Sequence, residues 1–290
     1  MKYNLSITLI LISLFLVSQI VGLFFINGSI QEVKELPSGE IVIEHKETVV
    51  ERPETEGGES FSFILLGIAM ATILMLIIIK LNLLKLWKLW FFIAVWLTIS
   101  VSLSVYINMY LAMLLAFALG LLKILKPEPI IHNITEILIY AGIVIIFVPI
   151  FDVFWVFMLL LAISIYDIIA VRKTKHMVKM AMFLTKSKLF AGLSFPLGKP
   201  LLKKPKTMDQ EVRKSAILGG GDIAFPLLFS GVVMENLITN GMTKLMSFSY
   251  TLIITLCAML SLSFLFWIAK EDKYYPAMPF LTTGCFIGYL

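Results

Sequence analysis

Two aspartates lie inside long apolar stretches of the chain, where a carboxylate is costly. Asp167 follows Tyr166 near the end of one stretch, and Asp222 follows the glycines at 219–221 near the start of the next. A charged side chain at membrane depth costs roughly 2.5 kcal/mol or more, so such residues usually have a functional role. In neighbouring antiparallel helices the two aspartates would overlap in depth. The sequence therefore predicts a carboxylate pair.

Such a pair could hydrolyse an amide bond. Two carboxylates that share a site titrate together, with one protonated and the other ionised. The ionised member takes a proton from water as the water attacks the amide carbon, and the protonated member donates to the carbonyl oxygen. This is aspartyl proteolysis, and it uses no metal, cofactor or covalent intermediate. The sequence does not assign the two roles.

Each aspartate also has a simpler explanation when it is considered alone. Tyr166 is typical of the aromatic residues at a membrane interface, beside an aspartate that ends a helix. Asp222 is typical of a helix N-cap after a glycine-rich turn. The matched depth of the two residues, together with a proline motif near the C-terminus, favours a catalytic pair.

The composition indicates that the chain resides in a membrane. Of the 290 residues, 59% are hydrophobic and 15% are charged, unlike a soluble domain. The apolar stretches are continuous and about 15 to 22 residues long, as expected for membrane-spanning helices. The net charge of +5 comes from loop residues, so topology accounts for it and it does not indicate nucleic-acid binding.

We predict an all-α integral membrane protein with nine transmembrane helices. The apolar run at 89–125 is too long for one crossing at about 1.5 Å per residue, so it is divided at 106–108. The predicted spans are 5–26, 61–81, the two halves of 89–125, 131–148, 151–170, 216–235, 247–269 and 275–290.

Two polar inserts of opposite charge interrupt the spans. The first, at 27–60, is rich in glutamate, and its segments 40–44 and 48–51 are predicted to pair as a hairpin. The second is rich in lysine and arginine, and 176–189 within it is predicted to lie on the membrane surface as a helix. The predicted divisions are an N-terminal six-helix bundle at 1–170, a basic cytoplasmic loop at 171–215 and a three-helix part at 216–290.

The basic residues orient the spans, because cytoplasmic loops are enriched in Lys and Arg. With a cytoplasmic N-terminus, all but four of the 24 basic residues lie inside. The four exceptions are Lys34, Lys46, Arg52 and Lys244. This predicts a multi-pass protein of the cell membrane, with the acidic insert and the C-terminus outside.

Three further carboxylates near span ends do not belong to the predicted pair. Glu235, like Asp152, lies at the outer end of its span, where water and headgroups reach it. Asp152 lies in an aromatic-rich segment, but it precedes Asp167 by roughly 22 Å along a helix, so the two cannot share a site at the depth of Asp222. Glu136 lies near the inner start of its span, where an interfacial position accounts for it.

The motifs around the two aspartates resemble those of presenilins and signal peptide peptidases, and the chain is similar to archaeal presenilin-like intramembrane aspartyl proteases. Tyr166-Asp167 looks like their YD motif, the 219–222 segment like GxGD, and the 276–279 segment like PAL, with Met278 in place of leucine. The motifs cover the chain from about residue 150 onward. The resemblance implies a presenilin-like fold, catalytic roles for Asp167 and Asp222, and site-shaping roles for Tyr166, Gly219, Gly220, Gly221, Pro276, Ala277, Met278 and Pro279.

These accessory residues suit a substrate that must unwind before attack. The freed backbone groups of an unwound helix need partners inside a membrane. Glycines allow close backbone approach, and Pro276 and Pro279 leave carbonyls free, so an extended substrate could bind by strand addition.

The implied function is an aspartic endopeptidase that cleaves within transmembrane segments or remnant signal peptides, near their inner ends. Its implied partners are single-pass or signal-peptide substrates and the lipid bilayer; the sequence is also compatible with an oligomer. The sequence holds no HExxH zinc motif. The alternative function is an ion channel or cation-coupled transporter, in which paired aspartates bind cations beside broken helices. No inverted repeat supports that alternative.

Overall fold

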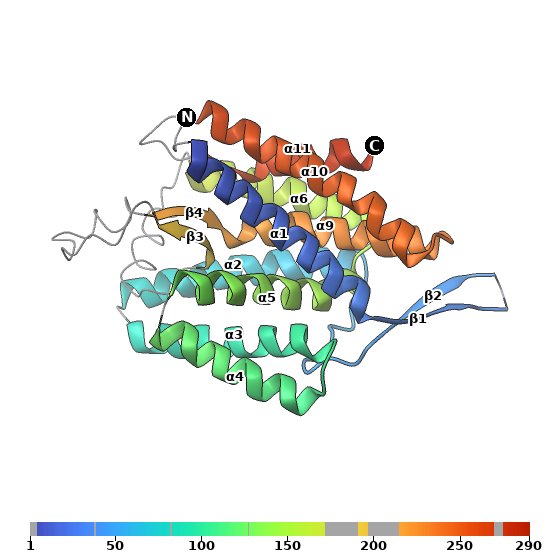
Figure 1. Cartoon of the computed structure of the whole chain (residues 1–290), viewed down its shortest axis with the longest axis horizontal. Helices are drawn as coiled ribbons and strands as arrows, with labels where there is room; N and C mark the ends of the chain where they lie inside the picture. The colour runs from blue at the N-terminus through green and yellow to red at the C-terminus, as the bar shows by residue number, and fades with distance from the viewer. Residues whose placement is uncertain are drawn as a thin grey trace.

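The computed structural model describes residues 5–37, 39–81, 83–126, 128–171, 191–196, 215–269 and 275–290. In these ranges the chain forms nine α-helices and two small antiparallel sheets (Figure 1). Six of the described helices are long and apolar enough to cross a membrane, and two more, α4 and α6, are shorter apolar helices. The predicted all-α membrane fold is confirmed.

Most helices begin and end within a few residues of the predicted spans. The helices are α1 Leu5–Ser29, α2 Gly58–Lys80, α3 Leu84–Ser104, α4 Met109–Leu125, α5 Pro129–Phe147, α6 Val153–Ile169, α9 Gly220–Thr239, α10 Lys244–Ile268 and α11 Met278–Tyr289. The short 3-10 helix η1, Val148–Ile150, follows α5. The strands are β1 Ile30–Glu35, β2 Ile41–His45, β3 Gly192–Pro196 and β4 Ser215–Gly219.

The seventh predicted span starts too early. Residues 216–219 were expected to be helical, but they belong to β4, and α9 begins only at Gly220. β4 pairs with β3 along its whole length, from Gly219 opposite Gly192 to Ser215 opposite Pro196. The pairing gives the backbone of this segment the partners that a helix would have supplied. The sequence pattern alone could not show it, because the partner strand lies in the basic loop.

The hairpin of the acidic insert has a different pairing from the one expected. β2 coincides with the first predicted segment, but it pairs with Ile30–Glu35 and not with 48–51. Gly39, with φ of 83°, lies in the connection, where glycine avoids backbone strain. The hairpin projects from the opposite end of the bundle to the β3–β4 sheet (Figure 1). The helix predicted at 176–189 falls outside the described residues.

Helix α9 lies at the centre of the bundle. It packs against α1, α5, α6, α10 and α11. Of its apolar 18-residue stretch, 61% is buried inside the protein, against 11% for the corresponding stretch of α2. The helix pair α3 and α4 forms one edge of the molecule, and α10 and α11 lie at the other (Figure 1). The segment that carries Asp222 is therefore held on several sides.

Polar residues mark the helix starts that position the bundle. Asn108 caps α4 by accepting a hydrogen bond from the backbone of Tyr110 at 2.9 Å, which confirms the predicted division at 106–108. Asp152 caps α6 in the same way, with Trp155 N–H at 2.9 Å. Asp152 is thus explained by helix capping and stays apart from Asp167.

Helices α10 and α11 approach closely because α11 presents glycines to its neighbour. A Cβ at Gly284 would lie 2.7 Å from the Cα of Ala258, and a Cβ at Gly288 would lie 2.6 Å from the Cα of Ile254. These two glycines are four residues apart, so they share one face of the helix. In a membrane, helix association depends on such close packing.

We expect Gly284→Val to destabilise the fold. The added side chain meets backbone atoms of α10 that cannot move independently, so the free energy of unfolding should fall by about 1–3 kcal/mol. Thermal unfolding in detergent measures the effect. The matched control is Gly67→Val on α2, because a Cβ at Gly67 meets nothing within 4 Å. Equal melting temperatures for the two variants would contradict the role of the α10–α11 contact.

Candidate active site

Asp167 and Asp222 lie at the same end of the bundle. Asp167 is in the last turn of α6, and Asp222 is in the first turn of α9. Helices α6 and α9 are in contact, and the two carboxylates are close enough for their charges to interact. The overlap in depth that the sequence suggested is present in the structure.

The start of α11 contacts Asp167. The backbone N–H of Met278 donates to Asp167 Oδ2 at 3.1 Å, and the backbone N–H of Ala277 is a second donor. These N–H groups are free because the first residues of a helix have no intrahelical acceptor. Pro276 is buried just before the helix and Pro279 lies in its first turn, so the proline motif places an N–H-rich helix start against the carboxylate.

A second polar contact joins α6 to α11 one turn further from the helix ends. Ser164 Oγ and Thr282 Oγ1 lie 2.7 Å apart, and both side chains are buried. Ser164 precedes Asp167 by three residues and Thr282 follows Met278 by four, so each pair shares a helix face. The two contacts together fix how α11 sits on the helix that carries Asp167.

The three glycines before Asp222 have different surroundings. A Cβ at Gly219 would lie 3.0 Å from Asp222 Oδ2, and a Cβ at Gly220 would lie 2.8 Å from the hydroxyl of Tyr140. A larger side chain at Gly219 would therefore displace the Asp222 carboxylate, and one at Gly220 would displace the Tyr140 ring. Gly221 is exposed, and a Cβ there would make only an ordinary contact of 3.5 Å with the Phe225 ring.

A small cavity of about 100 Å³ opens beside Asp222. Its volume is sufficient for a few water molecules but is well below the roughly 300–1,000 Å³ of a typical ligand pocket. Most of its lining residues are apolar, and they come from β4, the start of α9, the end of α10 and the segment before α11. The lining residues are Ile217, Leu218, Asp222, Leu262, Leu265, Phe266, Ala269, Tyr275 and Ala277.

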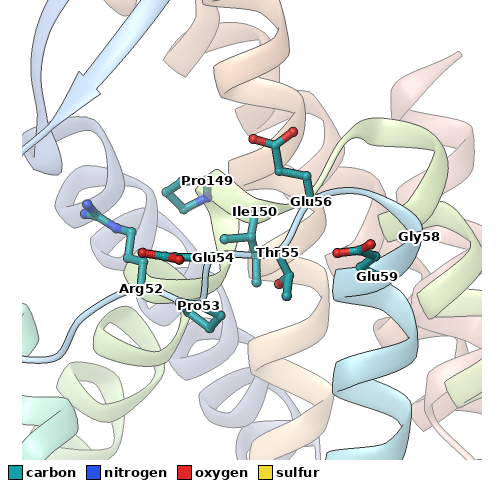
Figure 2. Close-up of a pocket in the computed structure, with 9 residues that line it drawn as sticks. All are labelled: Arg52, Pro53, Glu54, Thr55, Glu56, Gly58, Glu59, Pro149 and Ile150. Carbon is teal, nitrogen blue, oxygen red and sulfur yellow. The ribbon is translucent and has the colours of Figure 1, made fainter.

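A larger pocket of about 950 Å³ lies elsewhere (Figure 2). It is formed by residues 52–56 and 58–59 of the acidic insert together with Pro149 and Ile150, just before α6 begins. Asp167 lies at the other end of α6, roughly 20 Å away at 1.5 Å per residue. This pocket therefore does not contain the aspartate pair.

The remaining predicted site residue, Tyr166, connects α6 to the peripheral helix α2. Its hydroxyl lies 3.3 Å from Thr72 Oγ1, and its side chain is partly exposed. Within the described ranges, no group of three His, Cys, Asp or Glu side chains converges as metal ligands would.

A buried ion pair that was not predicted from the sequence lies close to the site. Lys123 at the end of α4 and Glu136 on α5 are 2.6 Å apart and almost fully buried. Glu136 had been interpreted as interfacial, and that interpretation is wrong. The sequence could have indicated the pair. The connection between α4 and α5 is short, so the two helices are antiparallel neighbours, and Lys123 and Glu136 lie on either side of that connection.

Comparison with known proteins gives one family. The sequence model described as "Signal-peptide peptidase, presenilin aspartyl protease" matches residues 46–290. Two crystal forms of a presenilin family intramembrane aspartate protease, in space groups C222 and P2, are similar in structure. The C222 form has a TM-score of 0.56 and 16% identity, covering 97% of this chain and 93% of that one. The P2 form has a TM-score of 0.57 and 17% identity, covering 98% and 95%. A search of curated proteins finds no match.

The contact between Ser164 and Thr282 generates a stability prediction. Thr282→Val should lower the free energy of unfolding by about 1–3 kcal/mol, because it leaves the buried Ser164 hydroxyl without this partner. Thermal unfolding of Thr282→Val, Ser164→Ala and the double variant should show that the two losses are not additive. Thr283→Val is the matched control, since Thr283 is exposed and bonds only to its own helix. Fully additive losses would show that the two hydroxyls do not interact.

Proposed function

The chain belongs to the signal-peptide peptidase and presenilin family of aspartyl proteases, and from this premise we propose that Asp167 and Asp222 together hydrolyse peptide bonds. The family makes the protein an intramembrane protease that acts on transmembrane substrates. The observation that carries the proposal is that the two carboxylates lie at the same end of the bundle, on contacting helices and close enough for their charges to interact. The proposed substrates are single-pass helices and remnant signal peptides.

The proposed reaction needs only the two side chains and a water molecule. One aspartate, ionised, accepts a proton from the water as the oxygen attacks the amide carbon. The other, protonated, donates to the carbonyl oxygen, which gives a tetrahedral intermediate with two hydroxyl groups. When the C–N bond breaks, the first aspartate gives its new proton to the leaving nitrogen, and the second takes a proton back from one of the hydroxyl groups. Backbone N–H groups of Ala277 and Met278 orient the Asp167 carboxylate for this exchange.

The surroundings of the glycines support a substrate that binds in an extended form. Gly219 and Gly220 are accounted for by contacts within the protein, whereas Gly221 is exposed beside Asp222. A missing side chain there lets a substrate backbone approach the carboxylate closely. β4 leads directly into this turn, so an unwound substrate segment can bind by strand addition next to the aspartates.

The cavity beside Asp222 sets a condition on substrate entry. At about 100 Å³ it does not hold an extended peptide. Binding therefore requires displacement of part of its wall, and we propose that the segment at 275–277 moves, because it belongs to no helix or strand. In the proposed orientation, with basic loops in the cytoplasm, the site lies near the inner face of the cell membrane.

The first test is cleavage of a labelled single-pass transmembrane peptide by purified protein in liposomes. Asp167→Asn and Asp222→Asn should each lower the cleavage rate by at least about a hundredfold, because each removes an acid or base from the reaction. Mass spectrometry identifies products cut within the apolar segment. The matched control is Asp152→Asn, which keeps a good helix cap and should cleave like the wild type.

Two outcomes would contradict the proposal. Cleavage that survives in either variant of the pair would remove that aspartate from the mechanism. Absence of cleavage across several peptides, together with a cation flux that both substitutions abolish, would favour the channel or transporter.

The proline motif generates a separate prediction. The double variant Pro276→Ala with Pro279→Ala lets α11 extend toward its N-terminus, which consumes the N–H groups that contact Asp167. The cleavage rate should fall by at least about tenfold, since small displacements of reacting groups are costly. Pro149→Ala, in η1 at the other end of α6, is the control and should retain activity. Unchanged cleavage by the double variant would count against this role of the motif.

A further inference from the structure

A buried ion pair joins α4 to α5, the helix that packs against β3. Lys123 Nζ and Glu136 Oε1 are 2.6 Å apart, with side chains only 2% and 1% exposed. The lysine also donates to Thr135 Oγ1 at 3.0 Å and lies 3.5 Å from His132 Nδ1. An ion pair removed from water is tolerated when hydrogen bonds complete its shell, which is the case here. Because the cost of desolvation offsets much of the attraction between the charges, a gain in stability alone does not explain the pair.

The second oxygen of Glu136 extends the ion pair to β3. Glu136 Oε2 accepts the backbone N–H of Gly192 at 3.1 Å, and His132 Nε2 lies 2.8 Å from the carbonyl oxygen of the same residue. Asn133 holds Ser194 similarly, with contacts of 2.9 Å and 3.0 Å to its carbonyl and N–H. Side chains of α5 thus bind the backbone of β3 along one edge.

The same oxygen of Glu136 also accepts the hydroxyl of Tyr140. That hydroxyl packs against Gly220, where a Cβ would come within 2.8 Å, and Tyr140 is close enough to Asp222 to interact with it electrostatically. Gly192, the other partner of this oxygen, is opposite Gly219 in the sheet. Glu136 Oε2 is therefore linked to Gly220 through Tyr140 and to Gly219 through Gly192.

We propose that Glu136 is a positioning residue, whose acceptor oxygen fixes β3 and Tyr140 and thereby the turn that presents Asp222. The inference rests on the proposed protease function of Asp222. It assigns a reaction-related role to residues that touch neither water nor substrate in the proposed mechanism. The competing explanation is that Glu136 serves only to neutralise Lys123.

Two double variants separate these explanations. Lys123→Met with Glu136→Gln removes both charges but keeps a carbonyl oxygen that accepts from Gly192 and Tyr140. Lys123→Met with Glu136→Met removes the charges and the acceptor. Neither variant leaves an unpaired buried charge, which a single substitution would do. Both are compared below their melting temperatures, so that the folded protein is measured.

The readout is the division of the loss between kcat and KM for the labelled transmembrane peptide. The methionine–glutamine variant should retain a kcat within about fivefold of the wild type. The kcat of the methionine–methionine variant should be lower by at least a further tenfold or so, with KM within about threefold, because the lost contact acts on Asp222 and not on substrate binding. Lys126→Met with Glu128→Met, an exposed pair at the same loop, is the control.

Each result decides the matter. Equal kcat values for the two double variants, whether both near the wild type or both low, would overturn the positioning role of the acceptor oxygen. Failure of the wild type to cleave, or cleavage by Asp222→Asn, would instead refute the proposed function. The two failures are therefore distinguishable in one series of assays.

Discussion

Carboxylates inside an apolar bundle need donors, and helix starts are where a backbone can supply them. Within a helix every N–H is already used, so a carboxylate beside helix walls alone would have no backbone partner. The chain places two helix starts at the level of the aspartates. α11 begins at Met278 and gives its first N–H groups to Asp167, and α9 begins at Gly220 with Asp222 in its own first turn.

The β3–β4 sheet holds in place the glycine-rich segment that leads into α9. The three glycines at the junction of β4 and α9 have little rigidity of their own, because glycine loses more backbone freedom on folding than other residues do. Here β4 anchors the turn on one side and Tyr140 closes it on another. The buried ion pair between α4 and α5 then ties β3 to the bundle. Rigidity is thus supplied by polar contacts around the site rather than by the segment that carries Asp222.

The opposite end of the bundle uses polar contacts of another kind. His45 of β2 lies 2.8 Å from Glu235 near the end of α9, and Lys244 donates to the carbonyl of Ile30 at 2.7 Å. These contacts attach the β1–β2 hairpin and the acidic insert to the ends of α9 and α10. The central helix is therefore held at both ends, with the aspartate at one and the insert at the other.

Local sequence determined the features that depend on local physics. Continuous apolar stretches predicted the helices, Asn108 and its neighbours the break between α3 and α4, and the depth of Asp167 and Asp222 their meeting at one end of the bundle. Only the tertiary structure decided which distant segments pair. β4 forms where the start of a helix was predicted, because β3 pairs with it. β2 pairs with Ile30–Glu35. Glu136 is buried and bonded to Lys123 and to the backbone of Gly192. Pairing of strands and burial of charge depend on partners far away in the chain, and hydrophobic periodicity carries no information about them.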